Sequence, residues 1–202
     1  IIMHDLERLD RLISDISRAS RLDAELSREA FQPVDLGSAL GHLIDIYKEP
    51  LERKKNSTPQ QQDKAFINGV EVRLDIPGKA NIQIWGLETR LVQVFENLLS
   101  NAVSFSPRKG VVTISLIAHK HQARITVEDQ GPGIPESKLE SIFERFYSER
   151  PEHEDYGRHS GLGLSICRQI IEAHQGRIFA ENIKDKSGTV KGARFVVILN
   201  TL

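Results

Sequence analysis

The stretch from Arg90 to Pro107 constrains the fold of this chain more than any other, because it predicts a helix with two chemically different faces. Apolar side chains recur at helical spacing along one face, which predicts that this face packs on a hydrophobic core. These apolar residues are Leu87, Leu91, Val94, Phe95, Leu98, Ala102 and Phe105. The opposite face carries a polar stripe that consists of Arg90, Gln93, Asn97, Asn101 and Ser104.

Asn97 and Asn101 lie one turn apart in the middle of this predicted helix. Asparagine is unfavourable there because its amide competes for backbone hydrogen bonds, so the pair indicates a use that offsets the cost. A neutral amide oxygen suits a Mg²⁺ ion that keeps most of its water and also binds nucleotide phosphates. From this stretch alone, a solvated helix face with incidental asparagines is an equally good interpretation.

Composition predicts one globular domain with an appendage. The chain has 202 residues and a formal net charge of −1, so its charge does not favour nucleic acid, and no apolar run is long enough to span a membrane. The single cysteine, Cys167, excludes an internal disulfide and fits a reducing cytoplasm. Its apolar helical neighbours predict a buried thiol. The start at Ile1, without a signal peptide, indicates a piece of a longer chain.

A long helix is predicted over residues 2–29. Its heptad seam consists of Ile2, Leu6, Leu9, Ile13 and Ile16. A second apolar stripe consists of Leu12, Ala19, Leu22 and Leu26. Because a helix with two apolar stripes needs several neighbours, its partners are expected to come from absent sequence or from another copy of the chain.

The rest of the chain mixes helical and strand patterns, which predicts an α+β fold: one mostly antiparallel sheet with helices on one face. A short extended link at 33–36 precedes a helix at about 37–53 and a polar, mobile loop at 54–64. Strands are predicted at 70–76, 82–84, 111–118, 124–129, 177–182 and 193–199, and a helix at 163–174 that stops at Gly176. His119 and His121 fall in a turn and are expected to be solvated.

Asp129 ends a strand in which it shares the apolar face with Ile125 and Val127. A carboxylate is costly in that position unless a donor binds it, and an adenine amino group is such a donor. Gly131 and Gly133 follow directly, so the backbone can turn sharply or approach a flat base without a Cβ clash. A plain turn after a strand is the alternative for this Asp-x-Gly-x-Gly sequence.

Gly161 and Gly163 open the predicted helix at 163–174, where free backbone N–H groups and the positive helix end form an anion site. This sequence is neither the Rossmann fingerprint nor a P-loop. Upstream, the aromatic segment 142–147 and the polar run from Ser148 to Ser160 predict a hinge and a lid over a ligand. A surface loop with anchoring aromatic residues is the alternative for that segment.

Taken in order, these motifs resemble the ATP-binding catalytic domain of sensor histidine kinases, a Bergerat-fold group shared with gyrase B, Hsp90 and MutL. The asparagine helix, Asp-x-Gly-x-Gly, the Phe-rich segment, Gly-x-Gly-Leu and a closing Gly192-x-x-Phe195 follow one another. The chain is most similar to the alphaproteobacterial envelope-sensing type. The resemblance implies that residues 1–30 are the second helix of a dimerisation and phosphotransfer bundle. It also implies that residues 31–202 are the ATP-binding catalytic domain.

The resemblance assigns roles to individual residues. It implies that Asn101 is the Mg²⁺ ligand with Asn97 beside it. Glu96 is then a candidate polarising group, with a helix-surface ion pair as its alternative role. It implies that Asp129 reads adenine. The other implied nucleotide contacts are Gly131, Gly133, Phe105, Phe143, Phe146, Arg145, Gly161, Leu162 and Gly163.

The chain departs from the family pattern near the phosphates. Ser104 and Ser148 stand where a basic residue is frequent, and His159 replaces a common glycine. Neutralisation of phosphate charge is therefore left open among four arginines: Arg108, Arg145, Arg150 and Arg158.

The resemblance implies transfer of the γ-phosphoryl group of Mg·ATP to a histidine, followed by relay to the receiver domain of a response regulator. The phospho-accepting helix would precede residue 1, and His4 lacks the proline that follows that histidine in the family. The implied setting is a homodimeric, inner-membrane sensor with this part in the cytoplasm, attached to the membrane only through absent N-terminal regions.

Two other functions are alternatives to the kinase. A gyrase B, Hsp90 or MutL type of ATPase needs a glutamate base one turn before the metal asparagine, where this chain has Asn97. A non-catalytic nucleotide-binding interaction module or phosphatase scaffold is the other alternative. Asn101, Asp129 and both glycine pairs count against it, and a nucleotide-binding assay would separate it from the kinase.

We expect concentration-dependent self-association through the heptad seam of residues 2–29, measurable by sedimentation. At about 25 cal/mol per Å², a few hundred Å² of apolar contact contributes several kcal/mol before association costs. Replacing Leu9 and Ile13 together with Glu should abolish the association without changing nucleotide affinity. A strictly monomeric parent at high concentration would contradict this expectation.

Overall fold

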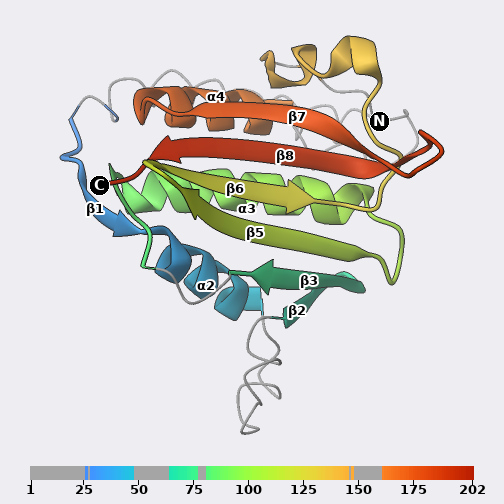
Figure 1. Ribbon diagram of the computed structural model, residues 1–202, viewed down its shortest axis with the longest axis horizontal. Helices are drawn as coiled ribbons and strands as arrows, with labels where there is room; N and C mark the ends of the chain where they lie inside the picture. The colour runs from blue at the N-terminus through green and yellow to red at the C-terminus, as the bar shows by residue number, and fades with distance from the viewer. Residues whose placement is uncertain (1–25, 27, 48–63, 77–80, 146, 148–160) are drawn as a thin grey trace, which may run out of the picture.

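The computed structural model describes residues 26, 28–47, 64–76, 81–145, 147 and 161–202 (Figure 1). Most of the predicted bundle helix, the polar loop before Lys64, Phe146 and the expected lid from Ser148 to Ser160 lie outside the described residues. Within the described part of the chain, no helix is long and apolar enough to cross a membrane.

The described elements form a mixed α+β fold, which confirms the predicted class. In chain order they are β1 (Gln32–Asp35), α2 (Leu36–Tyr47), β2 (Lys64–Ile67), β3 (Val70–Asp75), β4 (Gln83–Gly86), α3 (Glu88–Phe105), β5 (Val111–His119), β6 (Gln122–Glu128), η4 (Glu136–Lys138), η5 (Ser141–Phe143), α4 (Gly163–Ala173), β7 (Arg177–Lys184) and β8 (Val190–Asn200). A six-stranded sheet has the order β2-β3-β5-β6-β8-β7, and β1 and β4 form a separate two-stranded sheet.

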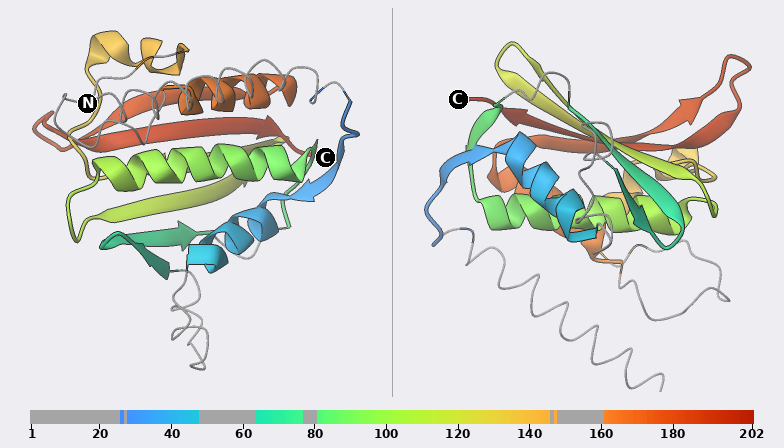
Figure 2. Two further views of the ribbon diagram at one scale, coloured as in Figure 1. Left: turned by 180° about the vertical axis from the view of Figure 1, so that it is seen from behind. Right: turned by 90° about the horizontal axis from the view of Figure 1, so that it is seen from below.

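All neighbours in the large sheet are antiparallel except β3 and β5, which are parallel. The helices α2, α3 and α4 cover one face of this sheet, as the view from below shows (Figure 2). A bridge between Ile84 and Thr201 connects the small sheet to the end of the chain. The layer arrangement is therefore the predicted one, with the small sheet as an addition.

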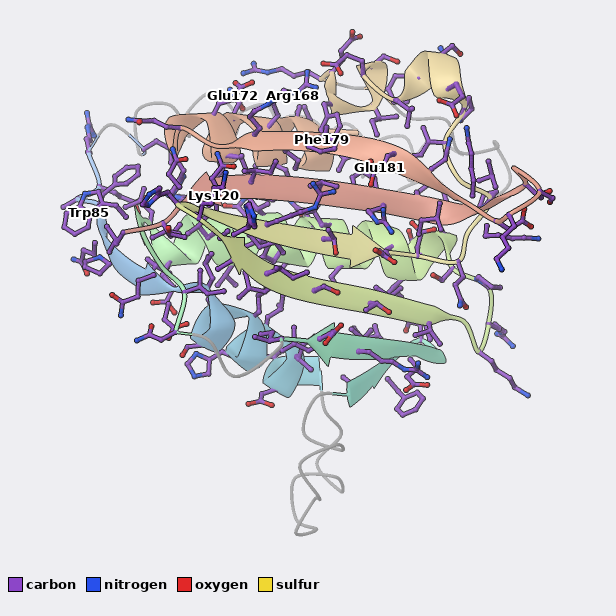
Figure 3. The ribbon with its side chains drawn as sticks, in the orientation of Figure 1. Trp85, Lys120, Arg168, Glu172, Phe179 and Glu181 are labelled. Carbon is purple, nitrogen blue, oxygen red and sulfur yellow. The ribbon has the colours of Figure 1, made fainter. Side chains whose placement is uncertain are left out.

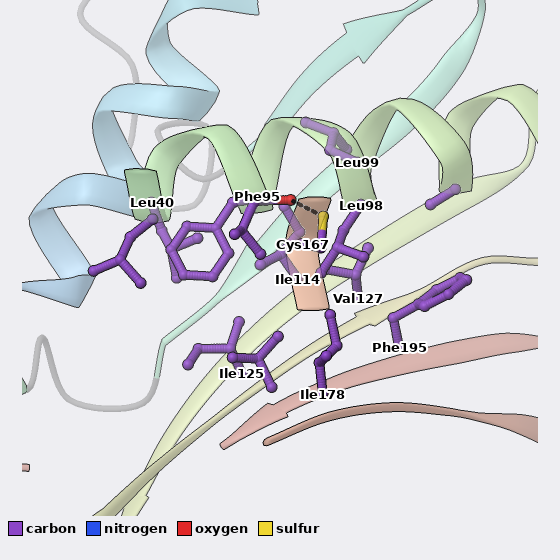
Figure 4. Packing of buried hydrophobic residues seen from close by; sticks show 14 of the residues in the cluster. Leu40, Phe95, Leu98, Leu99, Ile114, Ile125, Val127, Cys167, Ile178 and Phe195 are labelled. Carbon is purple, nitrogen blue, oxygen red and sulfur yellow. Dashed lines mark hydrogen bonds between the residues drawn. The ribbon is translucent and has the colours of Figure 1, made fainter. Parts of the chain in front are cut away.

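The hydrophobic core lies between the large sheet and α3 (Figure 4). Alternate residues of β5 and β6, such as Ile114 and Ile125, are fully buried beneath the apolar face of α3. Phe95 on that face of α3 is also fully buried. Cys167 of α4 is also fully buried, and burial raises the pKa of its thiol to about 12. The prediction of an unreactive structural thiol is thereby confirmed.

The hairpin of β2 and β3 was only half predicted. The strand from Val70 is confirmed, but the loop prediction extended to Lys64 and missed β2. Asn68 and Gly69 form the turn with φ values of 52° and 80°, the left-handed pair that favours Asn-Gly between two hairpin strands. The Asn-Gly dipeptide predicts a hairpin turn, and so it was the local sign that a short strand, β2, precedes Asn68 even though a polar run comes before it.

The end of α4 differs from the prediction in one detail. The left-handed residue is Gln175, with φ 55°, whereas Gly176 had been expected to cap the helix. Gly176 is required for a different reason: a Cβ there would lie 2.6 Å from the Ile198 carbonyl oxygen and 2.7 Å from a Leu199 methyl group. The glycine allows the chain to leave α4 close against β8.

His174 joins the end of α4 to the start of α3. Its Nδ1 donates to the Ile170 carbonyl (2.7 Å), and its Nε2 accepts the N–H of Leu87 (3.0 Å). The side chain is buried, and burial lowers the pKa of the imidazole. A neutral ring is the form that can accept from Leu87.

The segment that leads into β1 contacts the same end of the domain. The ring of Phe31 lies 4.8 Å from the His174 ring, and Glu29 forms an ion pair with Arg90 of α3. Leu26 packs against the hydrophobic core. Glu29 and Phe31 therefore hold the chain before β1 against the start of α3 and the end of α4.

His174 should make the fold sensitive to acid. Below the ordinary histidine pKa of 6.5 the unfolded chain binds a proton that the native imidazole resists, so the free energy of unfolding falls as the pH falls. Protonation also removes the acceptor for Leu87. In urea titrations at several pH values, His174→Gln should show a weaker pH dependence than the parent, while the exposed control His119→Gln should follow the parent. Parallel curves for parent and His174→Gln would contradict this role.

Candidate functional site

The antiparallel contact between α3 and α4 brings two of the predicted motifs together. Asn97 donates its side-chain N–H to the Gly163 carbonyl (3.4 Å), and Cys167 contacts the Val94 carbonyl at 3.7 Å. A Cβ at Gly163 would lie 3.8 Å from the Asn97 amide. The polar stripe of α3 therefore faces the N-terminus of α4.

The N-terminus of α4 retains the features of an anion site. Leu162 is its N-cap residue, and the helix has no side-chain cap. Ser165, the nearest hydroxyl, donates instead to the Leu162 carbonyl (2.9 Å). Gly161 has φ 72°, a left-handed conformation that favours glycine. Within the described part of the chain, no side chain caps the backbone N–H groups of this first turn, so they can bind a ligand at the positive end of the helix.

Asp129 is buried, as its place at the end of the apolar row predicted: only 5% of its surface is exposed. Its Oδ1 accepts the N–H groups of Gly131 (2.8 Å) and Ala193 (3.0 Å). Burial raises the pKa of the carboxyl group, and these two donors oppose the shift. Since both backbone donors bind Oδ1, the second carboxylate oxygen can accept a hydrogen bond from a ligand.

The loop after Asp129 lies against the end of α3. A Cβ at Gly131 would lie 2.7 Å from the Phe105 carbonyl oxygen, and Gly133 has φ 79°. The Phe105 side chain is 48% exposed, so the expectation that it belongs to the core face was wrong. Its backbone carbonyl lies beside the loop after Asp129, and the role of the aromatic side chain near a base stays a prediction.

α3 connects these two parts of the site. Asn97 and Phe105 are eight residues apart on α3, about 12 Å at the rise of an α-helix. Asn101 lies between them, half-buried, and its side chain has no hydrogen-bond partner among the described residues. Glu96 is also half-buried and next to Asn97. The arrangement suits an elongated ligand with a flat base at one end and an anionic group at the other.

Ile142 and Phe143, in the aromatic segment before the expected lid, are part of the core. Phe143 is 2% exposed and packs edge-on against Phe195 with ring centroids 6.3 Å apart, so its effect on a ligand would be indirect. Arg168 of α4 (Figure 3) lies over the Phe143 ring at 4.7 Å and pairs with Glu140 at 2.9 Å. Leu162 is likewise buried, so its contribution would come from its backbone.

Arg145 and Arg108 are exposed, whereas Arg150, Arg158 and Phe146 lie outside the described residues. No cluster of three or more His, Cys, Asp or Glu side chains that could hold a metal occurs in the described ranges. A metal here would depend on amide oxygens such as that of Asn101 and on ligand oxygens, a donor set that suits Mg²⁺.

The sequence analysis did not single out two residues that shape this site. Asn182 of β7 binds the backbone of Ile134, and Gln130 accepts the N–H of Val111 at 3.0 Å. Gly192 was noted only as part of a motif, but a Cβ there would overlap the Asp129 carbonyl oxygen. Asparagine in a strand, where it is generally disfavoured, was the available signal for Asn182.

This fold and site define a class of ATP-binding domain. Residues 86–201 match the family described as histidine kinase-, DNA gyrase B-, and HSP90-like ATPase, and the chain belongs to this family. It carries the ATP-binding catalytic domain of a histidine kinase, a conclusion that rests on this match together with the relatives described next.

The chain is 47% identical over 200 residues to the sensor protein ChvG of Rhizobium meliloti (98% of this chain, 33% of the relative) and 46% identical to that of Agrobacterium fabrum (98% and 32%). It spans about a third of the length of these relatives. The crystal structure of histidine kinase ThkA in complex with the response regulator TrrA is similar with a TM-score of 0.66, at 25% identity, over 100% of this chain and 50% of that one.

The Asp129→Asn variant should bind ATP and ADP about 1–3 kcal/mol more weakly than the parent, because an amide donor replaces the oxygen that faces an adenine amino group. The fold should persist, since the new amide oxygen still accepts the N–H groups of Gly131 and Ala193. Calorimetric titration measures both affinities, with the exposed Asp75→Asn as a control. GTP should bind the parent poorly, so equal affinities of the parent for GTP and ATP would contradict the assignment.

Proposed function

We propose that this chain binds ATP with Mg²⁺ and, as part of a longer sensor protein, donates the γ-phosphoryl group to a histidine outside this chain. The observation that carries the proposal is the joint placement of Asp129, with one oxygen free of backbone donors, and of Asn101 on the helix that leads from it toward the α4 N-terminus. Onward relay to the receiver domain of a response regulator accords with the solved ThkA complex.

The residues divide the work between base and phosphates. Asp129 accepts a hydrogen bond from the adenine amino group. Gly131 and Gly133 leave room for the base, and the exposed Phe105 ring packs near it. At the other end, the N–H groups after Gly161 bind phosphate oxygens. Asn101 would supply the protein ligand of a Mg²⁺ ion, which would neutralise part of the phosphate charge.

Phosphoryl transfer needs positioning and charge neutralisation more than covalent help, so the absence of a nucleophile in the proposed set fits this chemistry. Neutral imidazole is already nucleophilic near neutral pH, which lessens the need for a strong base. Glu96 is the candidate polarising group. Asn97 stands where a water-activating glutamate would be required for ATP hydrolysis, and its amide binds Gly163. The presence of an amide instead of a carboxylate at this position favours phosphoryl transfer over the gyrase-type reaction.

The wider setting is also a proposal. The longer protein would be a homodimer in the inner membrane, with this domain on the cytoplasmic side. Its dimerisation bundle would combine residues 1–30 with a preceding helix that carries the acceptor histidine. The alternative, a non-catalytic nucleotide-binding scaffold, predicts nucleotide binding without transfer.

We expect Asn101→Ala to lose most of the Mg²⁺-dependent part of the ATP affinity while the apolar face of α3, and so the fold, stays intact. Titrations with ATP in the presence and absence of Mg²⁺ measure this difference. The exposed Asn200→Ala is the matched control. An equal gain in affinity from Mg²⁺ in the Asn101→Ala variant and the parent would show that Asn101 is not the ligand.

A second assay tests the transfer itself. The parent should phosphorylate a supplied bundle fragment that bears the acceptor histidine, and the Asn101→Ala variant should do so much more slowly. Nucleotide binding by the parent without any transfer to that fragment would favour the non-catalytic alternative.

A further inference from the structure

Asn182 on the edge strand β7 holds the loop that follows Asp129. Its Oδ1 accepts the N–H of Ile134 (2.8 Å), and its Nδ2 donates to the carbonyl of the same residue (2.7 Å). The side-chain amide thus binds one backbone residue through both its donor and its acceptor. Asn and Gln are the neutral side chains that carry an amide donor and an acceptor side by side, and Asn is the shorter of the two.

Asn182 belongs to the same cross-strand row that fixes Asp129. It lies opposite Ala193 in the register of β7 and β8. Ala193 exchanges two hydrogen bonds with Asp129: its N–H binds the carboxylate Oδ1, and its carbonyl accepts the Asp129 N–H, both at 3.0 Å. The segment from Asp129 to Ile134 is therefore tied at its start to Ala193 and at its end to Asn182.

The loop between these two anchors is closely surrounded. A Cβ at Gly133 would lie 2.7 Å from the Asn182 Oδ1 and would overlap Val190. Two residues further along both segments, Lys184 binds Glu136 at 2.7 Å. Two side chains of β7, Asn182 and Lys184, therefore bind the chain that leads from Asp129 into η4.

We propose that Asn182 is a positioning residue for base recognition, which keeps the loop from Gly131 to Ile134 in the one conformation that orients the free oxygen of Asp129 toward a 6-aminopurine. Asn182 acts through this loop and does not itself touch the nucleotide. The inference rests on the proposed role of Asp129. It adds a second residue, on the edge strand of the sheet, that determines which base is bound.

The variant Asn182→Asp separates positioning from packing. At neutral pH the new carboxylate still accepts the Ile134 N–H but repels its carbonyl, so ATP affinity should fall about tenfold, as for the loss of one part-buried hydrogen bond. Affinity for inosine triphosphate, which lacks the amino group, should change little. Below the pKa of the new carboxyl group, its O–H can donate to the Ile134 carbonyl, so the difference between variant and parent in ATP affinity should shrink.

Nucleotide affinities of the parent and the variants are measured at the same pH values, because titratable side chains, among them Asp129, Glu136 and Lys184, also lie around this loop. Asn182→Ala should lose the preference for ATP over inosine triphosphate without recovery at low pH. The exposed strand residue Asn200→Asp is the matched control and should behave as the parent. Thermal unfolding confirms that each titration is made on folded protein.

The outcomes distinguish the two proposals. Loss of the ATP preference in Asp129→Asn, but not in either Asn182 variant, would overturn the positioning role alone. An equal loss of ATP and inosine triphosphate affinity in the Asn182 variants would reduce Asn182 to a structural residue and also overturn it. An unchanged preference in Asp129→Asn would overturn base reading by Asp129 and, with it, this inference.

Discussion

The buried carboxylate of Asp129 is the constraint on which the site depends. A carboxylate removed from water is costly, and here the N–H groups of Gly131 and Ala193 offset part of that cost. The second donor can reach Asp129 only because Gly192 has no Cβ that would overlap the Asp129 carbonyl oxygen. One charged group thus determines how β8, the loop after β6 and the end of α3 approach one another.

The antiparallel pair of α3 and α4 connects this site to the segment before β1. Near the glycines of α4 the contact is between Asn97 and Gly163, and at the opposite end it is between Leu87 and His174. Phe31 lies against the same histidine. The segment before β1 and the proposed nucleotide site therefore contact the same two helices.

The two faces of the large sheet have different roles. The helix-covered face supplies the core, whereas the other face carries ion pairs such as those of Arg194 with Glu128 and Glu181. These groups are about one-third exposed, and pairs of this kind contribute little to stability. The stability of the domain accordingly comes mainly from the apolar contacts between the helices and the sheet.

The sequence by itself determined the helix over Glu88–Phe105, the buried end of the apolar row at Asp129 and the buried thiol of Cys167. In each case a local period decides which side of an element faces the core. The same reasoning failed for Phe105, the last residue of α3, whose side chain is about half exposed although the period places it on the core face. It also missed β2, whose residues become a strand through pairing with β3.

Only the tertiary structure decided which groups meet across large distances in the chain. The bond of Asn182 to Ile134 spans 48 residues, and that of Leu87 to His174 spans 87. The need for glycine at 176 and 192 likewise comes from distant backbone that approaches there. Periodicity describes the environment of a residue, whereas its partner is set by strand register and helix packing, which the local pattern of residues does not contain.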